Sequence, residues 1–175
     1  MSSIHVVRIT AAVEKFTHAN EQLVTMLERL ADATRTPKSG GWTPAQIGWH
    51  VADTNTYAAA LLRGTVPGAR LSLAFIEDPA VFTKIPLRVE IPIPELYPPI
   101  DVTGGAAVQR LRASATDIVR AMRGLNADRA RTYTVQLPFG VITLYQLTEF
   151  VGAHVVRHQA QLIRASEESV VGTGS

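Results

Sequence analysis

Residues 143–165 read TLYQLTEFVGAHVVRHQAQLIRA and place His154 and His158 four positions apart in a run with the spacing of an α-helix. Apolar residues recur every three or four positions along this run, as they do on the buried face of a helix: Leu147, Phe150, Val151, Val155 and Leu162. The two histidines share that face, so we predict that both imidazoles point into the core. Residues four apart on a helix have Cβ atoms about 5–6 Å apart, which is close enough for both rings to bind one metal ion.

The length and composition of the chain fit one domain. Its 175 residues are enough for a hydrophobic core of its own. We predict that this domain spans residues 1–166 and that residues 167–175, which are mostly small or polar, form a flexible tail. Cysteine is absent from the sequence, which excludes disulfide bonds, thiolate metal ligands and a cysteine nucleophile. Any thiol chemistry therefore needs an external low-molecular-weight thiol.

The charge of the chain is nearly balanced, with 17 basic and 15 acidic residues and a formal net charge of +2. No run of lysine or arginine provides the positive surface typical of nucleic-acid binding. No apolar run approaches the roughly 18 residues that cross a membrane, and the first residues lack the apolar segment of a secretory signal. We therefore expect a cytoplasmic protein that has neither nucleic acid nor a membrane as its partner.

Three further segments, 3–31, 44–63 and 104–123, also have apolar residues at helical spacing. The second has a complete set of boundary signals, because Thr43 can cap its first turn together with Gln46 and Gly64 can end it. Thr143 and Gln146 repeat this capping pattern before the histidine pair. The sequence therefore predicts four long helices.

The segments between these helices differ in character. Residues 66–103 contain seven of the ten prolines, which rule out a continuous helix or a central strand, so we predict a long connection that borders the site and has one short helix near 71–77. Residues 126–140 are predicted to be irregular, with a brief strand at 133–137. The fold class that follows is all-α: a four-helix bundle with a long proline-rich crossover between helices 2 and 3.

A third histidine lies on the apolar face of the predicted helix 44–63. His50 shares this face with Ile47, Val51 and Leu61. Three neutral imidazoles on zinc leave its fourth position to water or substrate, as in catalytic rather than structural zinc sites. Imidazole also binds nickel and iron. Taken alone, however, the HxxxH pair is equally consistent with two hydrogen-bonded core histidines or with a surface pair.

Two motifs give the chain a family resemblance. The stretches GWTPAQIGWHVADT and EFVGAHVVRHQAQLIRA resemble the DinB superfamily, and the resemblance covers nearly the whole chain. It implies a four-helix bundle, often dimeric, in which His50, His154 and His158 bind zinc or nickel and Trp42 precedes the first ligand. Members with assigned chemistry include thiol S-transferases and mycothiol-dependent isomerases.

Two classes of function remain open at this stage. The first is a divalent-metal-dependent enzyme that acts on a small-molecule substrate, either as a thiol S-transferase with an external thiol or as a hydrolase. The alternative is a non-catalytic stress-response module that binds a metal or another ligand. The resemblance also makes a homodimer the expected assembly.

Residues outside the histidine triad are weaker candidates. Asp53, one turn after His50, could act as a catalytic base or orient a ligand, although an exposed or capping carboxylate is the more common role. Glu149 is expected to be a solvated charge on its helix. His5 and His18 have no partners in the sequence pattern and are predicted to be surface residues.

Overall fold

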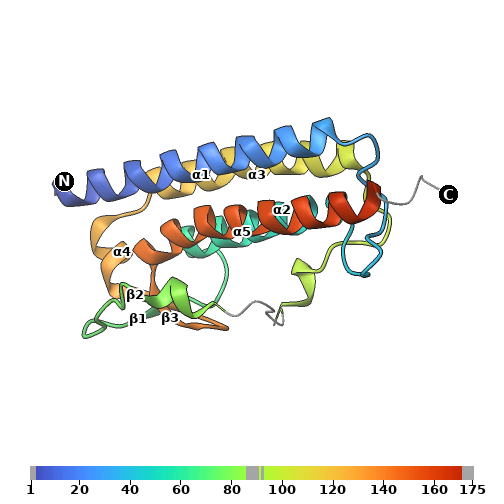
Figure 1. The fold of residues 1–175 in the computed structure, drawn as a ribbon. Coiled ribbons are helices and arrows are strands. Elements are labelled where there is room, and N and C mark those ends of the chain that lie inside the picture. Colours follow the sequence, from blue (N-terminus) through green and yellow to red (C-terminus); the bar gives the residue numbers. More distant parts are fainter. Residues whose placement is uncertain (1–2, 86–90, 92, 171–175) are drawn as a thin grey trace.

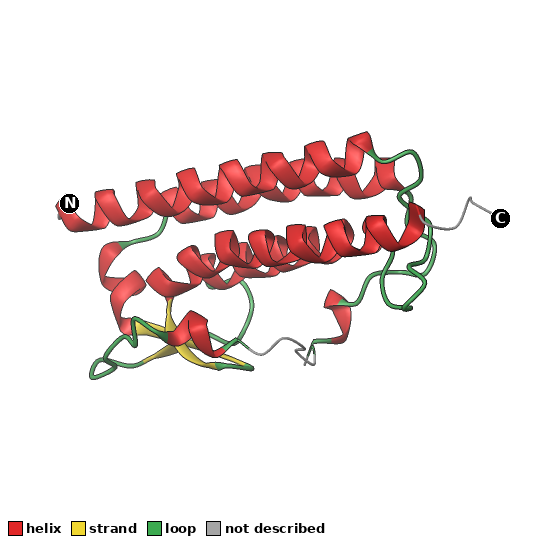
Figure 2. Cartoon of the chain, in the orientation of Figure 1, coloured by secondary structure: helices red, strands yellow, loops and turns green. Residues whose placement is uncertain are grey.

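Four long helices dominate the computed structural model, which describes residues 3–85, 91 and 93–170. They lie side by side in Figure 1, and a fifth, short helix follows the third. The bounds of the five are α1 Ser3–Arg29, α2 Pro44–Arg63, α3 Gly104–Arg123, α4 Ala127–Thr132 and α5 Leu144–Val170. The prediction of a mostly helical protein is confirmed (Figure 2). None of the helices in the described part of the chain has both the length and the apolar character needed to cross a membrane.

The long helices begin where the sequence predicts. Thr43 caps α2: its Oγ1 accepts from the backbone N–H of Gln46 at 3.2 Å, and the Gln46 side chain accepts from the Thr43 N–H at 3.0 Å. Thr143 and Gln146 form the same reciprocal pair at α5, with distances of 3.1 and 3.3 Å. These side chains satisfy N–H groups that the first turn of a helix leaves without partners.

The core lies between the four long helices. α1 and α2 each pack against both α3 and α5. The largest side chains that these helices bury face one another there: Phe16, Leu23, Ile47, Leu111, Ile118, Met122, Leu147 and Leu162. This packing brings the apolar faces of α2 and α5, which carry the three histidines, into contact.

A small three-stranded antiparallel sheet lies at one end of the helices (Figure 1). Its strands are β1 Arg70–Leu71, β2 Tyr133–Leu137 and β3 Gly140–Thr143, in that order. The strand predicted at 133–137 is confirmed. The short helix predicted near 71–77 is wrong, because this stretch starts in β1 and its next backbone N–H, that of Ser72, donates to Thr132 O at 2.7 Å. Pairing with a distant strand overrides the local helical pattern.

Two further features differ from the sequence-based expectations. The short helix α4 lies in the stretch predicted to be irregular, where Asn126 Oδ1 accepts from the N–H groups of Asp128 and Arg129. At the end of the chain, α5 continues to Val170, so residues 167–170 of the predicted tail are helical. The rest of that tail lies outside the described residues.

The long connection is tied to the helices at both ends. It contains two 3₁₀ turns, η1 Val81–Lys84 and η2 Pro94–Leu96. Gln146 Nε2 donates to Asp78 O at 2.8 Å, and Gln46 Nε2 donates to Pro99 O at 3.0 Å. The two glutamines that cap α5 and α2 therefore also hold the connection at Asp78 and near its end at Pro99.

Candidate metal centre

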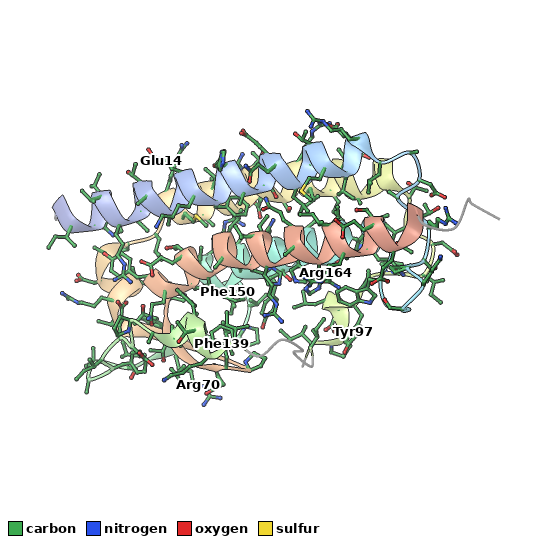
Figure 3. All side chains as sticks on the ribbon, viewed as in Figure 1. Glu14, Arg70, Tyr97, Phe139, Phe150 and Arg164 are labelled. Carbon is green, nitrogen blue, oxygen red and sulfur yellow. The ribbon has the colours of Figure 1, made fainter. Side chains whose placement is uncertain are left out.

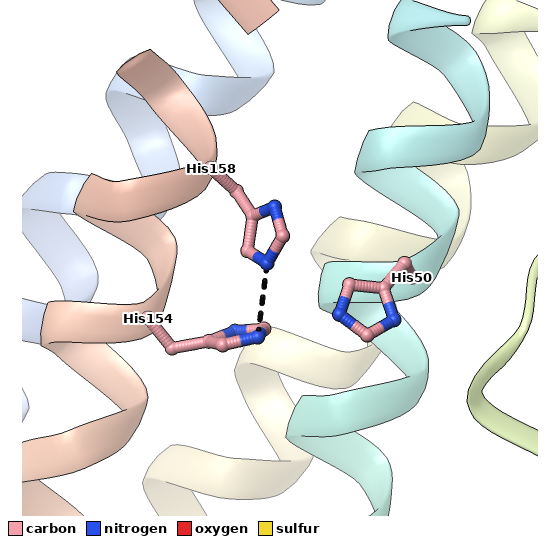
Figure 4. A group of neighbouring side chains, drawn as sticks. All are labelled: His50, His154 and His158. Atoms are coloured by element: carbon pink, nitrogen blue, oxygen red, sulfur yellow. Dashed lines mark hydrogen bonds between the residues drawn. The ribbon is translucent and has the colours of Figure 1, made fainter. Parts of the chain in front are cut away.

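The three predicted histidines meet between α2 and α5. Figure 4 shows His154 and His158 extending from α5 toward His50 on α2. One nitrogen from each ring can be chosen such that all three lie within 4.8 Å of one another. The ring centroids are 4.4 Å apart for His154 and His158, and 5.2 and 4.9 Å from each of these to His50. The structure thus brings together all three residues on which the sequence-based site rests.

Hydrogen bonds orient two of the rings. His50 Nδ1 lies 2.8 Å from the carbonyl oxygen of Leu96, and His158 Nδ1 lies 2.7 Å from Oε1 of Gln161. A carbonyl oxygen, whether of the backbone or of a side-chain amide, only accepts hydrogen bonds. Nδ1 of His50 and Nδ1 of His158 therefore carry the proton and donate it. The lone pair of each ring is then on Nε2, and a partner on the other nitrogen is the usual arrangement for a metal-ligating histidine.

The remaining ring, that of His154, is placed against His158. Their Nε2 atoms are 3.1 Å apart, and the buried Nδ1 of His154 has no hydrogen-bond partner in the described part of the chain. Two nitrogens bound tetrahedrally to one zinc ion at about 2.0–2.1 Å lie about 3.3 Å from each other. The observed spacing of these two nitrogens therefore fits a shared metal ion.

Burial keeps the triad neutral. His50 and His158 are buried, and His154 is half-buried. Burial lowers the pKa of His50, and it is also the main reason that the pKa of His158 falls to about 3. The pKa of His154 lies well below its usual range, because of burial and then the neighbouring His158 and His50. Neutral imidazole is the form that binds a metal, so the environment favours the ligand state.

Aromatic rings flank the triad on two sides. The ring of Trp42 lies 4.9 Å from that of His50, and the ring of Phe150 lies 5.4 Å from that of His154. Trp42, which precedes the first candidate ligand in the sequence, packs on the ring of that ligand. Apolar surroundings of this kind limit the access of water to a metal site.

Asp53 is buried and forms an ion pair. Its Oδ1 lies 2.5 Å from Nη2 of Arg110, whose guanidinium also stacks on Trp49 at 4.5 Å. The carboxylate thus has a partner on α3, and its negative charge acts on His50 only by raising the pKa of that ring against the larger effect of burial. The expectation of an exposed or capping carboxylate does not hold for this residue.

Other residues differ from the sequence-based expectations. His5 is buried and its Nδ1 lies 2.7 Å from the Tyr145 hydroxyl, so its prediction as a surface residue is wrong. Glu149 pairs with Arg8 at 2.6 Å. Two groups that orient the triad were missed. Gln161 follows His158 by three positions and could have been found from helical spacing, whereas the Leu96 carbonyl is 46 residues from His50 and has no local signal.

Comparison with known protein families identified a match over most of the chain. The family model described as DinB superfamily matches residues 12–162, a range that includes the three histidines. The searches of curated proteins and of solved structures returned no match.

Proposed function

The chain belongs to the DinB superfamily, and on this premise we propose that it is a divalent-metal-dependent enzyme with His50, His154 and His158 as the metal ligands. One observation carries the proposal: three buried or half-buried, neutral imidazoles converge from two helices. Two of them have Nδ1 bound to an oxygen, which leaves Nε2 for a metal ion. Three protein ligands rather than four are typical of catalytic sites.

Zinc and nickel are the ions that we propose. A set of imidazole nitrogens without thiolate or carboxylate suits both, and metal identity in proteins depends on geometry and supply as well as on ligand type. When bound, such an ion would supply Lewis acidity and make a nucleophile of water or of an external thiol near neutral pH. The corresponding reactions are hydrolysis and thiol S-transfer on a small-molecule substrate.

The protein's own groups have distinct roles in this proposal. The Leu96 carbonyl and the Gln161 amide orient His50 and His158 and keep their protons on Nδ1. Trp42 and Phe150 cover the rings of His50 and His154 and restrict water. We further assign α1, α2, α3 and α5 to a four-helix bundle in which residues 66–103 are the crossover, an assignment that the pairwise packing of these helices supports.

Metal content is the first test. Untagged protein, exposed to zinc and then dialysed, should retain near-stoichiometric metal, whereas His50→Ala and His154→Ala should lose it. The exposed His18 provides the control, because His18→Ala should retain metal as the wild type does. Equal metal content in all four proteins would contradict the triad as the binding site.

A second pair of variants tests the orientation of His158. Gln161→Leu removes the acceptor for His158 Nδ1 and should weaken zinc binding by about 10–100-fold, as the loss of such outer partners does elsewhere. Gln159→Leu on the same helix loses a bond to Ala19 O instead and should leave zinc affinity unchanged. A competition titration with a chromogenic chelator measures both.

A measurement of substrate turnover distinguishes the proposed enzyme from a non-catalytic binding module. A thiol S-transferase consumes an added thiol together with an electrophile, a hydrolase turns over without thiol, and a non-catalytic module does neither. In an enzyme, His50→Ala should abolish turnover while circular dichroism shows that the helices persist. Metal binding without turnover on thiol and ester substrates would favour the module.

A further inference from the structure

Three phenylalanines from three separate elements come together beside the triad. Phe82 is in η1, Phe139 is in the turn between β2 and β3, and Phe150 is on α5. Their ring centroids are 5.4 Å apart for Phe139 and Phe150, 6.3 Å for Phe82 and Phe150, and 6.5 Å for Phe82 and Phe139. We call these residues the phenylalanine wall.

The wall adjoins the histidines directly. Phe150 precedes His154 by one helical turn, and the two rings are 5.4 Å apart. Figure 3 shows Phe150 on α5 and Phe139 on the hairpin below it. On the other side of the triad, Trp42 contacts His50 and also meets Tyr97 edge-on at 6.2 Å. The candidate metal site thus lies between two groups of aromatic rings.

Contacts with the core and with α5 fix the segments that carry the phenylalanine wall. Val81, next to Phe82, is buried, and the chain just before it is fixed by the bond from Gln146 to Asp78 O. The turn that carries Phe139 lies against η1, where a Cβ on Gly140 would be 3.7 Å from Val81 Cγ2. The Val81 side chain of η1 and the hairpin therefore lie side by side, and all three rings of the wall pack against the hydrophobic core.

All three rings are only partly buried. Large apolar rings that a fold needs for stability alone are normally covered, so a cluster of partly exposed rings next to a reactive site can bind an apolar ligand group. Aromatic rings pack against one another edge-to-face or offset at centroid distances of about 4.5–7 Å, which are the distances within the wall. An additional ring could extend this array.

We propose that the phenylalanine wall is a substrate subsite that binds an aromatic ring and thereby holds the substrate's reactive group next to the three histidines. The inference rests on the proposed function, since it specifies the class of substrate for the same site. The subsite would favour substrates with an aryl group one or two bonds from the reacting atom over small polar substrates.

The test uses cobalt-loaded protein and two thiols as probes, phenylmethanethiol and mercaptoethanol. Binding of each thiol to cobalt is followed by the thiolate-to-cobalt absorption band. Phenylmethanethiol should bind about tenfold more tightly than mercaptoethanol to the wild type. Phe139→Ala should remove most of this preference and leave mercaptoethanol affinity unchanged. Phe82→Ala should act in the same direction.

Phe75→Ala is the matched control, because Phe75 is half-buried in the same connection but makes none of the ring contacts above. This variant should keep the full preference. Equal affinity of the wild type for both thiols, or a preference that survives in Phe139→Ala and Phe82→Ala, would overturn the proposal.

A metal-free measurement keeps this test independent of the metal assignment. Benzyl alcohol, titrated into metal-free protein, should cause saturable shifts of the amide resonances of Phe139 and Phe150, and Phe139→Ala should abolish them. If cobalt does not bind but these shifts occur, the metal proposal fails and the aromatic subsite stands. If cobalt binds but the thiols show no aromatic preference and benzyl alcohol causes no saturable shifts, the aromatic subsite is wrong and the metal proposal stands.

Discussion

The three imidazoles of the triad differ in what their second nitrogen contacts. His50 donates to a backbone carbonyl of the long connection, and His158 donates to Gln161 on its own helix. His154 has no such partner in the described part of the chain. Because tautomer and orientation follow from the second nitrogen, His50 and His158 are pre-oriented as ligands, and His154 depends on its contact with His158.

Burial of the triad makes the stability of the metal-free protein depend on pH. An unfolded histidine has a pKa of about 6.5, whereas the folded pKa of His158 is about 3. Between these values the unfolded chain binds more protons than the folded one. The contribution of these histidines to stability is therefore most favourable above about pH 6.5 and falls toward acid by up to about 1.4 kcal/mol per pH unit for each one. The fall ends below the folded pKa.

Urea unfolding of chelator-treated protein at about pH 7 and about pH 5 measures this fall. We expect His158→Gln to lose less stability on acidification than the wild type, because one group with a lowered pKa is gone. The exposed His18 supplies the comparison, and His18→Gln should follow the wild type. A fall in His158→Gln as steep as that of the wild type would contradict the role of this histidine.

At the scale of elements, the same residues that start the helices also hold the long connection. Gln46 and Gln146 complete the capping boxes of α2 and α5 with their Oε1 atoms and bind Pro99 O and Asp78 O with their Nε2 atoms. Between these two anchors, the Leu96 carbonyl accepts from His50. The connection is therefore part of the candidate site.

This link predicts that metal protects the connection from proteolysis. Cleavage needs local opening, and a metal ion that holds His50 also holds the Leu96 carbonyl to its ring. We expect zinc to slow tryptic cleavage within 66–103 by roughly tenfold, as read by mass spectrometry of the fragments. His50→Ala should cleave at the same rate with and without zinc. Protection by zinc that persists in this variant would show that the ion acts elsewhere.

At the scale of the whole molecule, small residues set how closely the helices approach. Gly48 on α2 lies where a Cβ would come within 2.6 Å of Leu27 Cδ1 on α1 and within 3.4 Å of Ala107 and Leu111 on α3. Gly152 on α5 faces the backbone of Phe16, where an added Cβ would lie 3.5 Å from the N and Cα atoms of that residue. A Cβ at Gly48 would overlap Leu27, and at both glycines the missing side chain lets a histidine-bearing helix lie close to its neighbours.

We therefore expect Gly48→Val to destabilise the protein by about 1–3 kcal/mol, because the added methyl groups overpack the contact of three helices. Gly105→Val is the control: a Cβ at this exposed position of α3 meets nothing within 4 Å, and valine should be tolerated there. Thermal unfolding of both variants checks the prediction. An unchanged stability of Gly48→Val would mean that the helices can move apart without cost.

The sequence alone determined the parts of this protein that depend on near neighbours. Apolar spacing and capping residues predicted the four long helices and put His50, His154 and His158 on inward faces. In these long segments such signals repeat over several helical turns and do not depend on contacts with distant residues. The strand at 133–137 was also predicted from its local sequence.

Only the tertiary structure decided the features that join distant segments. The pairing of β1 with β2 overrode a helical pattern, Arg110 neutralised Asp53 from another helix, and a carbonyl of the connection oriented His50. The phenylalanine wall likewise assembles from three separate elements. Backbone carbonyls, ion pairs between helices and ring contacts depend on where segments meet in space, and no local pattern encodes those positions.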